Sequence, residues 1–351
     1  MNLKSLLLSS DDKTVRVLRR VLSDLEIEIE HCSGSDAALH RITRQRFEAI
    51  IVDCANREVA GNILRATKAA PVNKRALSII LVDNHIGLKG GFELGAHFVL
   101  HKPLAVERAK ASFRAVRALM KSERRLQMRV PVEIPITCIG SSHYPARTID
   151  LCEGGMAIQF TGRKAKETSL RFAIELPGAE KGCEKLEIAG EVAWEGDEYR
   201  AGVRFKDVSD SQRDVLRKWL AARLPEHEPD DPPVVCRLKD LSATACYLTT
   251  TSPFPKLSRV ILTVQTGEPA VRAGGVVRIT HPEVGMGVEF LQSTPEQQEQ
   301  VRVLTETLRA NAESVELHVE PNGLEVPLDE KSASAAASAG DVLVHLFHEQ
   351  S

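Results

Sequence analysis

Short apolar runs alternate with amphipathic stretches along the first 120 residues. The runs predict strands, and the stretches in which apolar residues recur every three or four positions predict helices. Strands are expected at 6–8, 27–30, 49–52, 77–82 and 97–100, with helices at 14–25, 35–46 and 106–120. This order predicts an α/β domain, built on a parallel sheet, over residues 1–120.

Acidic residues and one lysine follow the predicted strands where each strand ends. Asp11 and Asp12 follow the first strand, Asp53 ends the third, and Lys102 follows the fifth. Ligands of such sheets bind at the carboxyl ends of the strands, so we expect these side chains to share one pocket. The three carboxylates could hold Mg²⁺, Asp53 could attack a phosphoryl donor, and Lys102 could pair with the added charge.

This order of residues resembles the receiver domain of response regulators, with Asp53 in the position of the phospho-acceptor. The resemblance implies a flavodoxin-like fold for this domain. Gly61 keeps the family's spacing, whereas Asn56 and Arg57 stand where the family usually has Met-Pro, and Val82 replaces its hydroxyl residue. A valine cannot donate a hydrogen bond to a phosphoryl oxygen. Two interpretations stay open: a pseudo-receiver that serves as a scaffold, or a domain that is still phosphorylated at Asp53.

The next segment, 121–224, changes to short alternating runs punctuated by glycine and polar residues. This pattern predicts a small antiparallel barrel that is closed by a helix at 209–224. The expected strands cover 133–138, 144–149, 155–160, 170–175, 186–195 and 200–205.

Two motifs flank the start of this predicted barrel. Arg125 and Arg129 precede its first strand, and Asp150, Cys152 and Gly155 lie where one strand turns into the next. With the final strand 201–205, they resemble the PilZ domain, a bacterial receptor for cyclic di-GMP. The resemblance implies that these five residues bind the dinucleotide.

The chemistry of these residue types agrees with that ligand. Arginine can pair with a phosphate or a guanine edge and can also stack, and Asp150 can accept hydrogen bonds from guanine N–H groups. Gly155 would allow a close backbone approach. Cys152 stands at the family's serine position, and because a thiol is a weaker donor we expect affinity to fall about tenfold.

An acidic, proline-rich linker at 225–234 precedes a repeat of the barrel pattern at 235–312. Segment 239–242 aligns with 149–152, 273–277 with 189–193, and 286–290 with 201–205, and a helix is expected at 295–308. An internal repeat of this length predicts a second six-stranded barrel. It keeps Asp240 and Ser242 but has Ala245 at the glycine position and acids in place of the arginine pair, so we expect a degenerate copy that does not bind the nucleotide.

The composition changes again in the C-terminal extension, 313–351. Runs at 315–319 and 324–328 flank Pro321-Asn322-Gly323 and predict a hairpin. Residues 331–340 are rich in alanine and serine and predict a flexible tether. The apolar stretch 341–348 is either a docking element for a partner or a frayed end.

Composition limits the classes of partner and the cellular location that we expect. A net charge of −2 and an aromatic content of 4% argue against a nucleic-acid partner. No apolar run reaches the roughly 20 residues that cross a bilayer, and the first residues do not have the pattern of a secretory signal. The seven cysteines form no CxxC pair, which favours reduced thiols and a cytoplasmic location.

The sequence contains no motif of the common enzyme classes, so we expect a protein that is not an enzyme and requires no cofactor. The leading interpretation is a cytoplasmic bacterial signalling adaptor that binds cyclic di-GMP and transmits to a protein partner through domain rearrangement. Two alternatives stay open: a structural interaction protein without a working ligand site, and a phosphorelay regulator that acts through Asp53. The sequence does not identify the partner or the oligomeric state.

Overall fold

The structure, a computed structural model, describes residues 3–83, 87–162, 167–179, 182–197, 199–206, 208–224, 231–265, 270–310 and 316–325. The chain divides into two compact units. Arg124–Pro229 forms one, and Met1–Glu123 together with Asp230–Ser351 forms the other.

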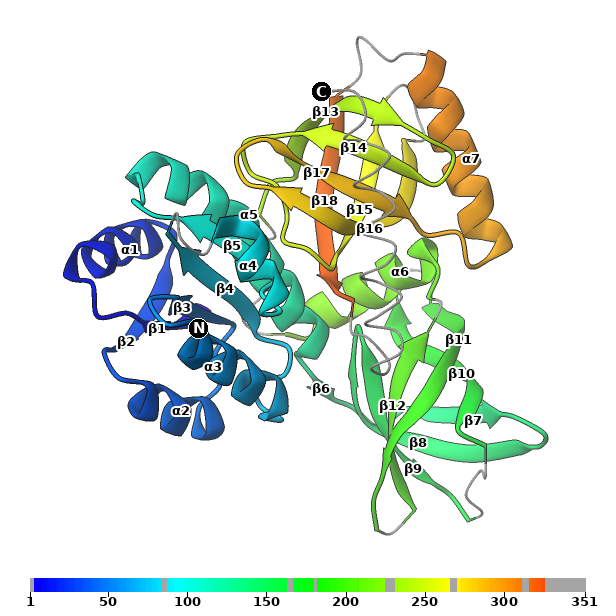
Figure 1. Cartoon of the computed structure of the whole chain (residues 1–351). Coiled ribbons are helices and arrows are strands. Elements are labelled where there is room, and N and C mark those ends of the chain that lie inside the picture. Colours follow the sequence, from blue (N-terminus) through cyan, green and yellow to red (C-terminus); the bar gives the residue numbers. More distant parts are fainter. Residues whose placement is uncertain are drawn as a thin grey trace. The chain divides into compact units, whose positions relative to one another are not determined.

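The N-terminal domain is built on a parallel sheet of five strands in the order β2-β1-β3-β4-β5 (Figure 1). The strands are β1 (Leu3–Leu8), β2 (Ile27–Cys32), β3 (Ala49–Asp53), β4 (Leu77–Val82) and β5 (Phe98–His101). All five predicted strands are therefore confirmed. The core of β3 and β4 is continuously apolar because both faces of the sheet are covered by helices.

Two layers of helices cover this sheet. One face packs against α1 (Asp12–Asp24) and α5 (Val106–Gln127), and the other against α2 (Ser35–Arg44), α3 (Arg57–Ala69) and α4 (Gly87–Glu93). The helices α3 and α4 are not among the elements predicted from the sequence. A local signal for α3 exists, since the Asn56 side chain accepts hydrogen bonds from the N–H groups of Glu58 and Val59 and so caps the helix.

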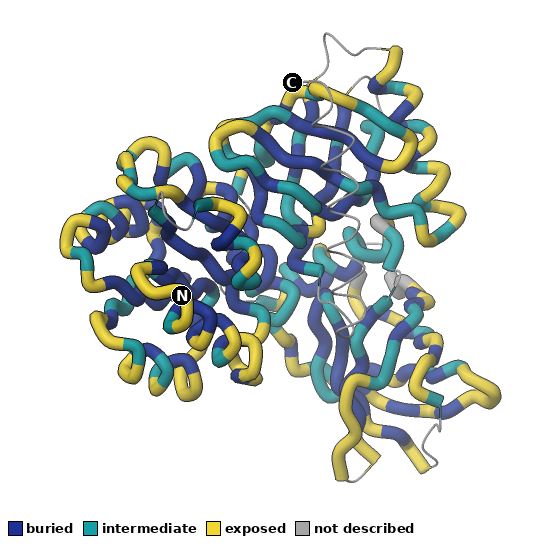
Figure 2. Tube along the Cα trace, viewed as in Figure 1, coloured by how far each residue is buried: buried dark blue, intermediate teal, exposed yellow. Residues whose placement is uncertain are grey.

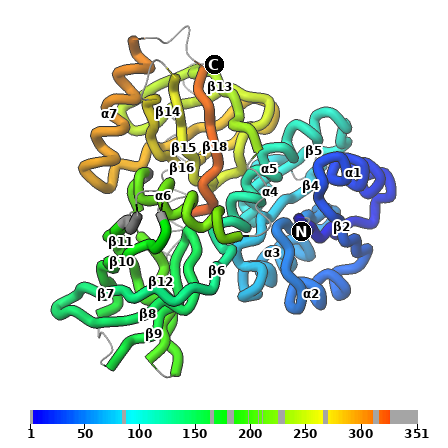
Figure 3. Tube along the Cα trace, turned by 180° about the vertical axis from the view of Figure 1, so that it is seen from behind, coloured from blue at the N-terminus to red at the C-terminus, as the bar shows by residue number. Residues whose placement is uncertain are grey.

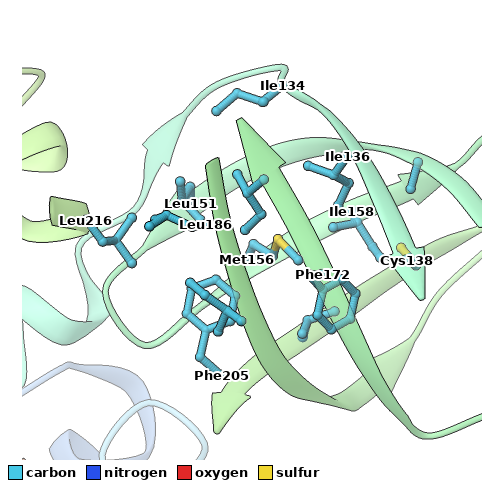
Figure 4. Packing of buried hydrophobic residues seen from close by; sticks show 14 of the residues in the cluster. Ile134, Ile136, Cys138, Leu151, Met156, Ile158, Phe172, Leu186, Phe205 and Leu216 are labelled. Carbon is cyan, nitrogen blue, oxygen red and sulfur yellow. The ribbon is translucent and has the colours of Figure 1, made fainter. Parts of the chain in front are cut away.

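The unit Arg124–Pro229 contains the first closed barrel. Its six strands form the ring β8-β7-β10-β11-β12-β9, closed by pairing between β8 and β9, and a short β6 adds to β8. The strands are β6 (Val130–Pro131), β7 (Pro135–Ile139), β8 (His143–Cys152), β9 (Gly155–Phe160), β10 (Ser169–Ala179), β11 (Gly182–Glu195) and β12 (Arg200–Lys206). Inward-facing apolar side chains such as Met156, Ile158 and Phe172 fill the interior (Figure 4).

The helix α6 (Asp210–Ala221) closes one end of the first barrel. It begins with a capping box, in which Ser209 and Gln212 bond to each other's backbone N–H groups. Leu216, Trp219 and Leu220 pack into the barrel core, as the helical spacing of the sequence predicts.

The second barrel has six strands in the closed order β13-β14-β17-β16-β15-β18. They are β13 (Val234–Leu241), β14 (Ala245–Thr249), β15 (Ser258–Val264), β16 (Val271–His281), β17 (Gly285–Phe290) and β18 (Glu316–Leu324), and the helix α7 (Pro295–Ala310) follows β17. The repeat in the sequence is therefore a structural repeat. Val301, Leu304 and Leu308 of α7 pack into the barrel core.

The predicted hairpin around Pro321-Asn322-Gly323 is wrong. These residues lie inside the single strand β18, which pairs antiparallel with both β13 and β15 (Figure 3). The register with β15 shifts between Ser258 and Val260, opposite Gly323 with its φ of 84°. A β-bulge uses the same glycine conformation as a hairpin turn, so the local signal was real but the pairing was not predicted. The second barrel thus extends past the expected boundary at 312, and the segments 331–340 and 341–348 lie outside the described residues.

The two barrels place their strands in the same ring with a different chain order. In the first barrel, β7 lies between β8 and β10 and comes before them in the chain. In the second barrel, β18 takes the equivalent place between β13 and β15, but it follows α7. The second barrel is therefore a circularly permuted version of the first.

The N-terminal domain and the second barrel share the helix α5. Phe113, Val116 and Leu119 of this helix pack against the parallel sheet, whereas Ala115 and Ala118 belong to the core of the second barrel. α5 is seven residues longer than the predicted 106–120, and its inner side is buried along most of its length (Figure 2).

Polar contacts fix the C-terminal half of this shared helix. Lys121 Nζ lies 2.9 Å from Asp231 Oδ1, and Arg117 also pairs with Asp231. Glu123 bonds to Arg75 at 2.7 Å and accepts from the N–H of Leu324 at the end of β18. Asp231, predicted as part of a spacer, is instead anchored to α5, while 225–230 lie outside the described residues.

Candidate functional site

Arg129 and Asp150 meet on the outer face of the first barrel. Asp150 lies near the end of β8, next to a register shift, and its Oδ1 accepts from the N–H of Ala157 at 3.1 Å. Arg129 Nη1 donates to the same oxygen, and the arginine side chain is 42% exposed. The structure therefore brings these two predicted site residues together where a ligand could reach them.

Arg125 lies elsewhere. It occupies the last turn of α5, and its side chain is buried with its Nε 2.9 Å from Glu153 Oε1. Glu153 follows Cys152 in the turn between β8 and β9, and Arg217 of α6 approaches its other oxygen at 3.7 Å. The two arginines, predicted to act together, thus have different partners and different exposure.

Cys152 and Gly155 shape the turn between β8 and β9. The buried Cys152 thiol donates to the carbonyl of Gly155, with Sγ 3.2 Å from the oxygen, and burial raises the pKa of this thiol. A Cβ on Gly155 would lie 2.2 Å from the carbonyl oxygen of Val203 in β12. The close approach that the sequence analysis assigned to a ligand is therefore made by the neighbouring strand.

One row of cross-strand neighbours runs from Asp150 across three further strands. Asp150 pairs with Ala157, Ala157 with Gly202, and Gly202 with Trp194. A Cβ on Gly202 would lie 2.0 Å from Trp194 Nε1, so the indole lies directly over the glycine backbone. Two small residues thus separate an acid–arginine pair from a tryptophan that is 48% exposed.

Trp194 is not among the site residues predicted from the sequence. The sequence contains a signal for it, since the chain has only two tryptophans. Trp194 lies near the end of the predicted strand 186–195, and the next predicted strand, 200–205, contains Gly202. Its position opposite Gly202, however, depends on a register shift between Val192 and Trp194 that the periodicity does not show.

Cationic side chains flank this row on the same face. Arg147 and Arg200 both lie opposite Gln159, two residues along β9 from Ala157. From Arg147 an open groove of about 480 Å³ continues across β7 and β10, past Thr137 and Glu175. The face therefore has the charge and the room for an anionic ligand of moderate size.

The second barrel has the same turn but a different face. Ser242 Oγ donates to the carbonyl oxygen of Ala245 at 3.0 Å, which corresponds to the bond from Cys152 to Gly155. The Ser242 hydroxyl also accepts from the N–H of Ala245 at 2.9 Å. Along the equivalent row, Asp240 pairs with Tyr247 instead of an alanine. The Tyr247 hydroxyl lies 2.8 Å from His281 Nδ1, so a ring occupies the centre of this row.

In the N-terminal domain, Asp53 is held by two side chains. Ser9 Oγ donates to Oδ2 at 2.8 Å and Lys102 Nζ donates to Oδ1 at 2.6 Å, and the Asp53 side chain is 4% exposed. The predicted pairing of Lys102 with this site is present. Val82, at the position of the expected hydroxyl, is fully buried.

The predicted magnesium site of Asp11, Asp12 and Asp53 is not assembled. Asp11 caps α1, accepting from the Lys13 N–H at 3.0 Å and from Thr14 Oγ1 at 2.6 Å, which lowers its pKa. Asp12 is exposed in the first turn of the same helix. Ser9, the first residue after β1, lies beside Asp53 instead. Within the described part of the chain, no three acidic, histidine or cysteine side chains are grouped to hold a metal.

Two further predictions from the sequence concern the state of the cysteines and the presence of a membrane-spanning segment. The cysteine side chains that the structure describes are buried thiols, and burial raises the pKa of Cys138 and Cys236 to about 12. Of the helices in the described ranges, none has the length and apolar character needed to cross a membrane.

Comparisons with known proteins place the first barrel in a family. Residues 123–222 match the family model of the PilZ domain. Among solved structures, the PilZ domain of CeSA from a cellulose-synthesizing bacterium is 19% identical, covering 26% of this chain and 91% of that chain with a TM-score of 0.21. The comparison with curated proteins gives no match.

Receiver domains and response regulators are also among the similar solved structures. The receiver domain of the sensor histidine kinase PA1611 from Pseudomonas aeruginosa PAO1 is 20% identical, covering 33% of this chain and 95% of that chain, with a TM-score of 0.30. A putative response regulator from Chloroflexus aurantiacus J-10-fl is also 20% identical, covering 34% and 99% with a TM-score of 0.30. The chain carries a PilZ domain at residues 123–222, between a receiver-like α/β domain and a second closed barrel.

Proposed function

We propose that the first barrel binds cyclic di-GMP on its outer face, between the Arg129–Asp150 pair and Trp194. The observation that carries this proposal is the row of cross-strand neighbours Asp150, Ala157, Gly202 and Trp194. It combines a carboxylate, a partly exposed guanidinium and an exposed indole within a domain that matches the PilZ family.

Each end of the row supplies a different interaction. Asp150 can accept from the N1–H and N2–H₂ groups of a guanine, which adenine does not offer in the same arrangement. Arg129 can exchange its bond to Asp150 for a phosphate oxygen, and Arg147 and Arg200 add positive charge on the same face. The exposed face of Trp194 can stack on a base, which is worth about 1–3 kcal/mol per base.

We further propose that the chain is a cytoplasmic signalling adaptor that is not an enzyme and passes ligand binding to a protein partner. The PilZ unit is inserted into the chain between the two parts of the other unit. Because α5 joins the receiver-like domain to the second barrel, the domain rearrangement would involve that whole unit.

The receiver-like domain serves this adaptor as a scaffold rather than as a phosphorelay switch. Asp53 is almost fully buried and already paired with Lys102 and Ser9, and Val82 offers no donor to a phosphoryl group. Treatment with acetyl phosphate is therefore expected to leave the mass of the assembly and the nucleotide affinity unchanged. A change that Asp53→Ala abolishes would establish the phosphorelay alternative.

Calorimetric titration of the full chain tests the nucleotide proposal, with cyclic di-AMP as the control ligand. Cyclic di-GMP is expected to bind with a stoichiometry of one site per chain and to quench the fluorescence of Trp194, and this quenching should be lost in Trp194→Ala. Arg129→Ala and Trp194→Ala should each weaken binding about tenfold or more. Arg171→Ala, on an exposed position of β10, is the matched control.

Two outcomes would overturn the proposal. Absence of heat and of quenching with excess cyclic di-GMP would leave the structural interaction protein as the better account. Equal affinity of the parent and of Trp194→Ala would show that the ligand lies elsewhere.

A further inference from the structure

We infer that Glu153 competes with the bound nucleotide for Arg125, and so sets the ligand affinity and links the ligand site to helix α6. This inference rests on the proposed function, because it concerns regulation of the same site. Its basis is an ionic cluster in which the buried Arg125 and Glu153 meet the partly exposed Arg217, at the turn that follows Asp150 and Cys152.

The position of Glu153 makes it a competitor. It follows Asp150 and Cys152 in the turn between β8 and β9, yet its side chain is 2% exposed and lies against Arg125 rather than on the outer face. Arg125 precedes Arg129 by four residues, so both arginines belong to one short segment of chain. If a dinucleotide phosphate is to engage both arginines, Arg125 has to leave Glu153.

The cluster is poorly satisfied for a buried group. Glu153 Oε2 accepts no hydrogen bond within the described part of the chain. Arg217 Nε lies 3.7 Å from this oxygen and also lacks a hydrogen-bond partner there. A buried carboxylate oxygen without a donor is destabilising, so this arrangement is not optimised for stability alone. Exchange of Arg125 between Glu153 and a phosphate therefore exchanges one charged partner for another.

The same cluster reaches α6. Arg217 lies on that helix, and Met128, Leu220 and Leu224 line the narrow space around Arg125 and Glu153. Withdrawal of Arg125 would leave Glu153 with Arg217 alone and would loosen the packing of Met128 against α6. Ligand binding on one face of the barrel would thus change the packing of α6, the helix that closes the barrel.

Two substitutions with opposite expected effects test the inference. Glu153→Gln keeps the shape but removes the competing charge, and we expect it to tighten binding of cyclic di-GMP about tenfold. Arg217→Gln leaves Glu153 to Arg125 alone, and we expect it to weaken binding several-fold. Glu187→Gln, on an exposed position of β11, is the matched control and should leave affinity unchanged.

Hydrogen exchange supplies a readout that does not depend on affinity. With saturating cyclic di-GMP, backbone amides of α6 should exchange faster in the parent protein, whereas amides of 125–129 should exchange more slowly. In Glu153→Gln the amides of α6 should already exchange faster without the ligand.

The outcomes separate this inference from the proposed function. If the parent protein does not bind cyclic di-GMP, the proposed function fails. If the parent binds but Glu153→Gln binds equally or more weakly, or if the ligand leaves the exchange of α6 unchanged, then Arg125 is a structural anchor and the inference fails while the proposed function stands.

Discussion

The two barrels of this chain share a ring of strands and a turn, and they differ in the face beside that turn. In both, a thiol or hydroxyl donates to the carbonyl three residues later, at Cys152 in one barrel and Ser242 in the other. The row that begins at Asp150 continues with an alanine, whereas the row that begins at Asp240 continues with Tyr247. The turn motif therefore maintains the fold in both barrels, while the residues across the strands decide whether a ligand face exists.

The chain order of the barrels differs as well. The first barrel begins with β7 and forms its own unit, whereas the second ends with β18 and shares its core with α5. The strand that closes the ring comes from the start of the first repeat and from the end of the second. Closure therefore requires only a strand that pairs with both neighbours, which are β8 and β10 in the first barrel and β13 and β15 in the second. The permuted order in turn lets β18 end beside Glu123 on α5.

The largest expected effect concerns Gly155. Gly155→Ala places a Cβ against the Val203 carbonyl oxygen, which belongs to the backbone of β12 and cannot move without distorting the barrel. We expect the first barrel to lose about 3 kcal/mol of unfolding free energy. Both tryptophans lie in this barrel, so their fluorescence in a denaturant titration reports its unfolding.

The second barrel supplies the control for that variant. It has Ala245 at the same position, so Ala245→Gly should cost only about 1 kcal/mol and should leave the tryptophan transition unchanged. A Gly155→Ala protein that unfolds within about 1 kcal/mol of the parent would contradict the close packing of this turn against β12.

The second prediction transfers the face of one barrel to the other. Ala157→Tyr puts a ring at the centre of the row, as Tyr247 does, and should weaken cyclic di-GMP binding about a hundredfold, equivalent to ~2.7 kcal/mol. Calorimetry measures this, and an unchanged tryptophan unfolding curve shows that the barrel is intact.

The reciprocal change should create no site. In Tyr247→Ala, Asp240 still lacks an arginine pair in the preceding sequence, which is acidic. The stoichiometry of the parent protein should therefore be retained. A second equivalent of bound nucleotide would show that the aromatic ring alone keeps the second barrel inactive.

A third, intermediate effect distinguishes the two units by pH. His97 Nδ1 accepts from the Ser78 N–H at 2.9 Å, and burial, followed by the charge of Lys68, lowers the pKa of His97 to about 4. The unfolded chain has a histidine pKa of about 6.5, so this group contributes stability that is complete above pH ~6.5 and is lost as the pH falls toward 4.

The unit that contains the receiver-like domain should therefore lose on the order of 2 kcal/mol between neutral pH and pH 4 from this group. Far-UV circular dichroism of denaturant unfolding at several pH values measures the loss. His97→Gln, which keeps an acceptor for Ser78, should flatten this dependence while the tryptophan transition of the PilZ unit stays the same. An equal pH slope in parent and variant would remove His97 as the cause.

The smallest effect is expected for Cys152→Ser. The residue types alone predict that the serine tightens binding. In the structure, however, the buried Cys152 thiol bonds to the Gly155 carbonyl, as the Ser242 hydroxyl bonds to that of Ala245. We therefore expect cyclic di-GMP affinity to change less than about threefold, or ~0.7 kcal/mol. Tightening of tenfold or more in the titration would place residue 152 in contact with the ligand.

Local patterns determined much of the architecture from the sequence. The continuous apolar runs of β3 and β4, the alternation in the barrel strands and the amphipathic spacing of α6 depend on near neighbours in the chain, and each formed the element it predicts. The repeat of Asp150 and Cys152 at Asp240 and Ser242 likewise revealed the second barrel, because an identical turn requires similar residues.

Tertiary structure decided which of these elements meet. Pro321-Asn322-Gly323 fits a turn or a bulge equally well, and only pairing with β15 selects the bulge. The register of four strands places Trp194 in the row of Asp150. Ser9, rather than Asp11, bonds to Asp53, and Arg125 pairs with Glu153. Each of these contacts joins residues that are distant in sequence, so a register or a buried charge partner selects it, and neither leaves a periodic trace in the chain.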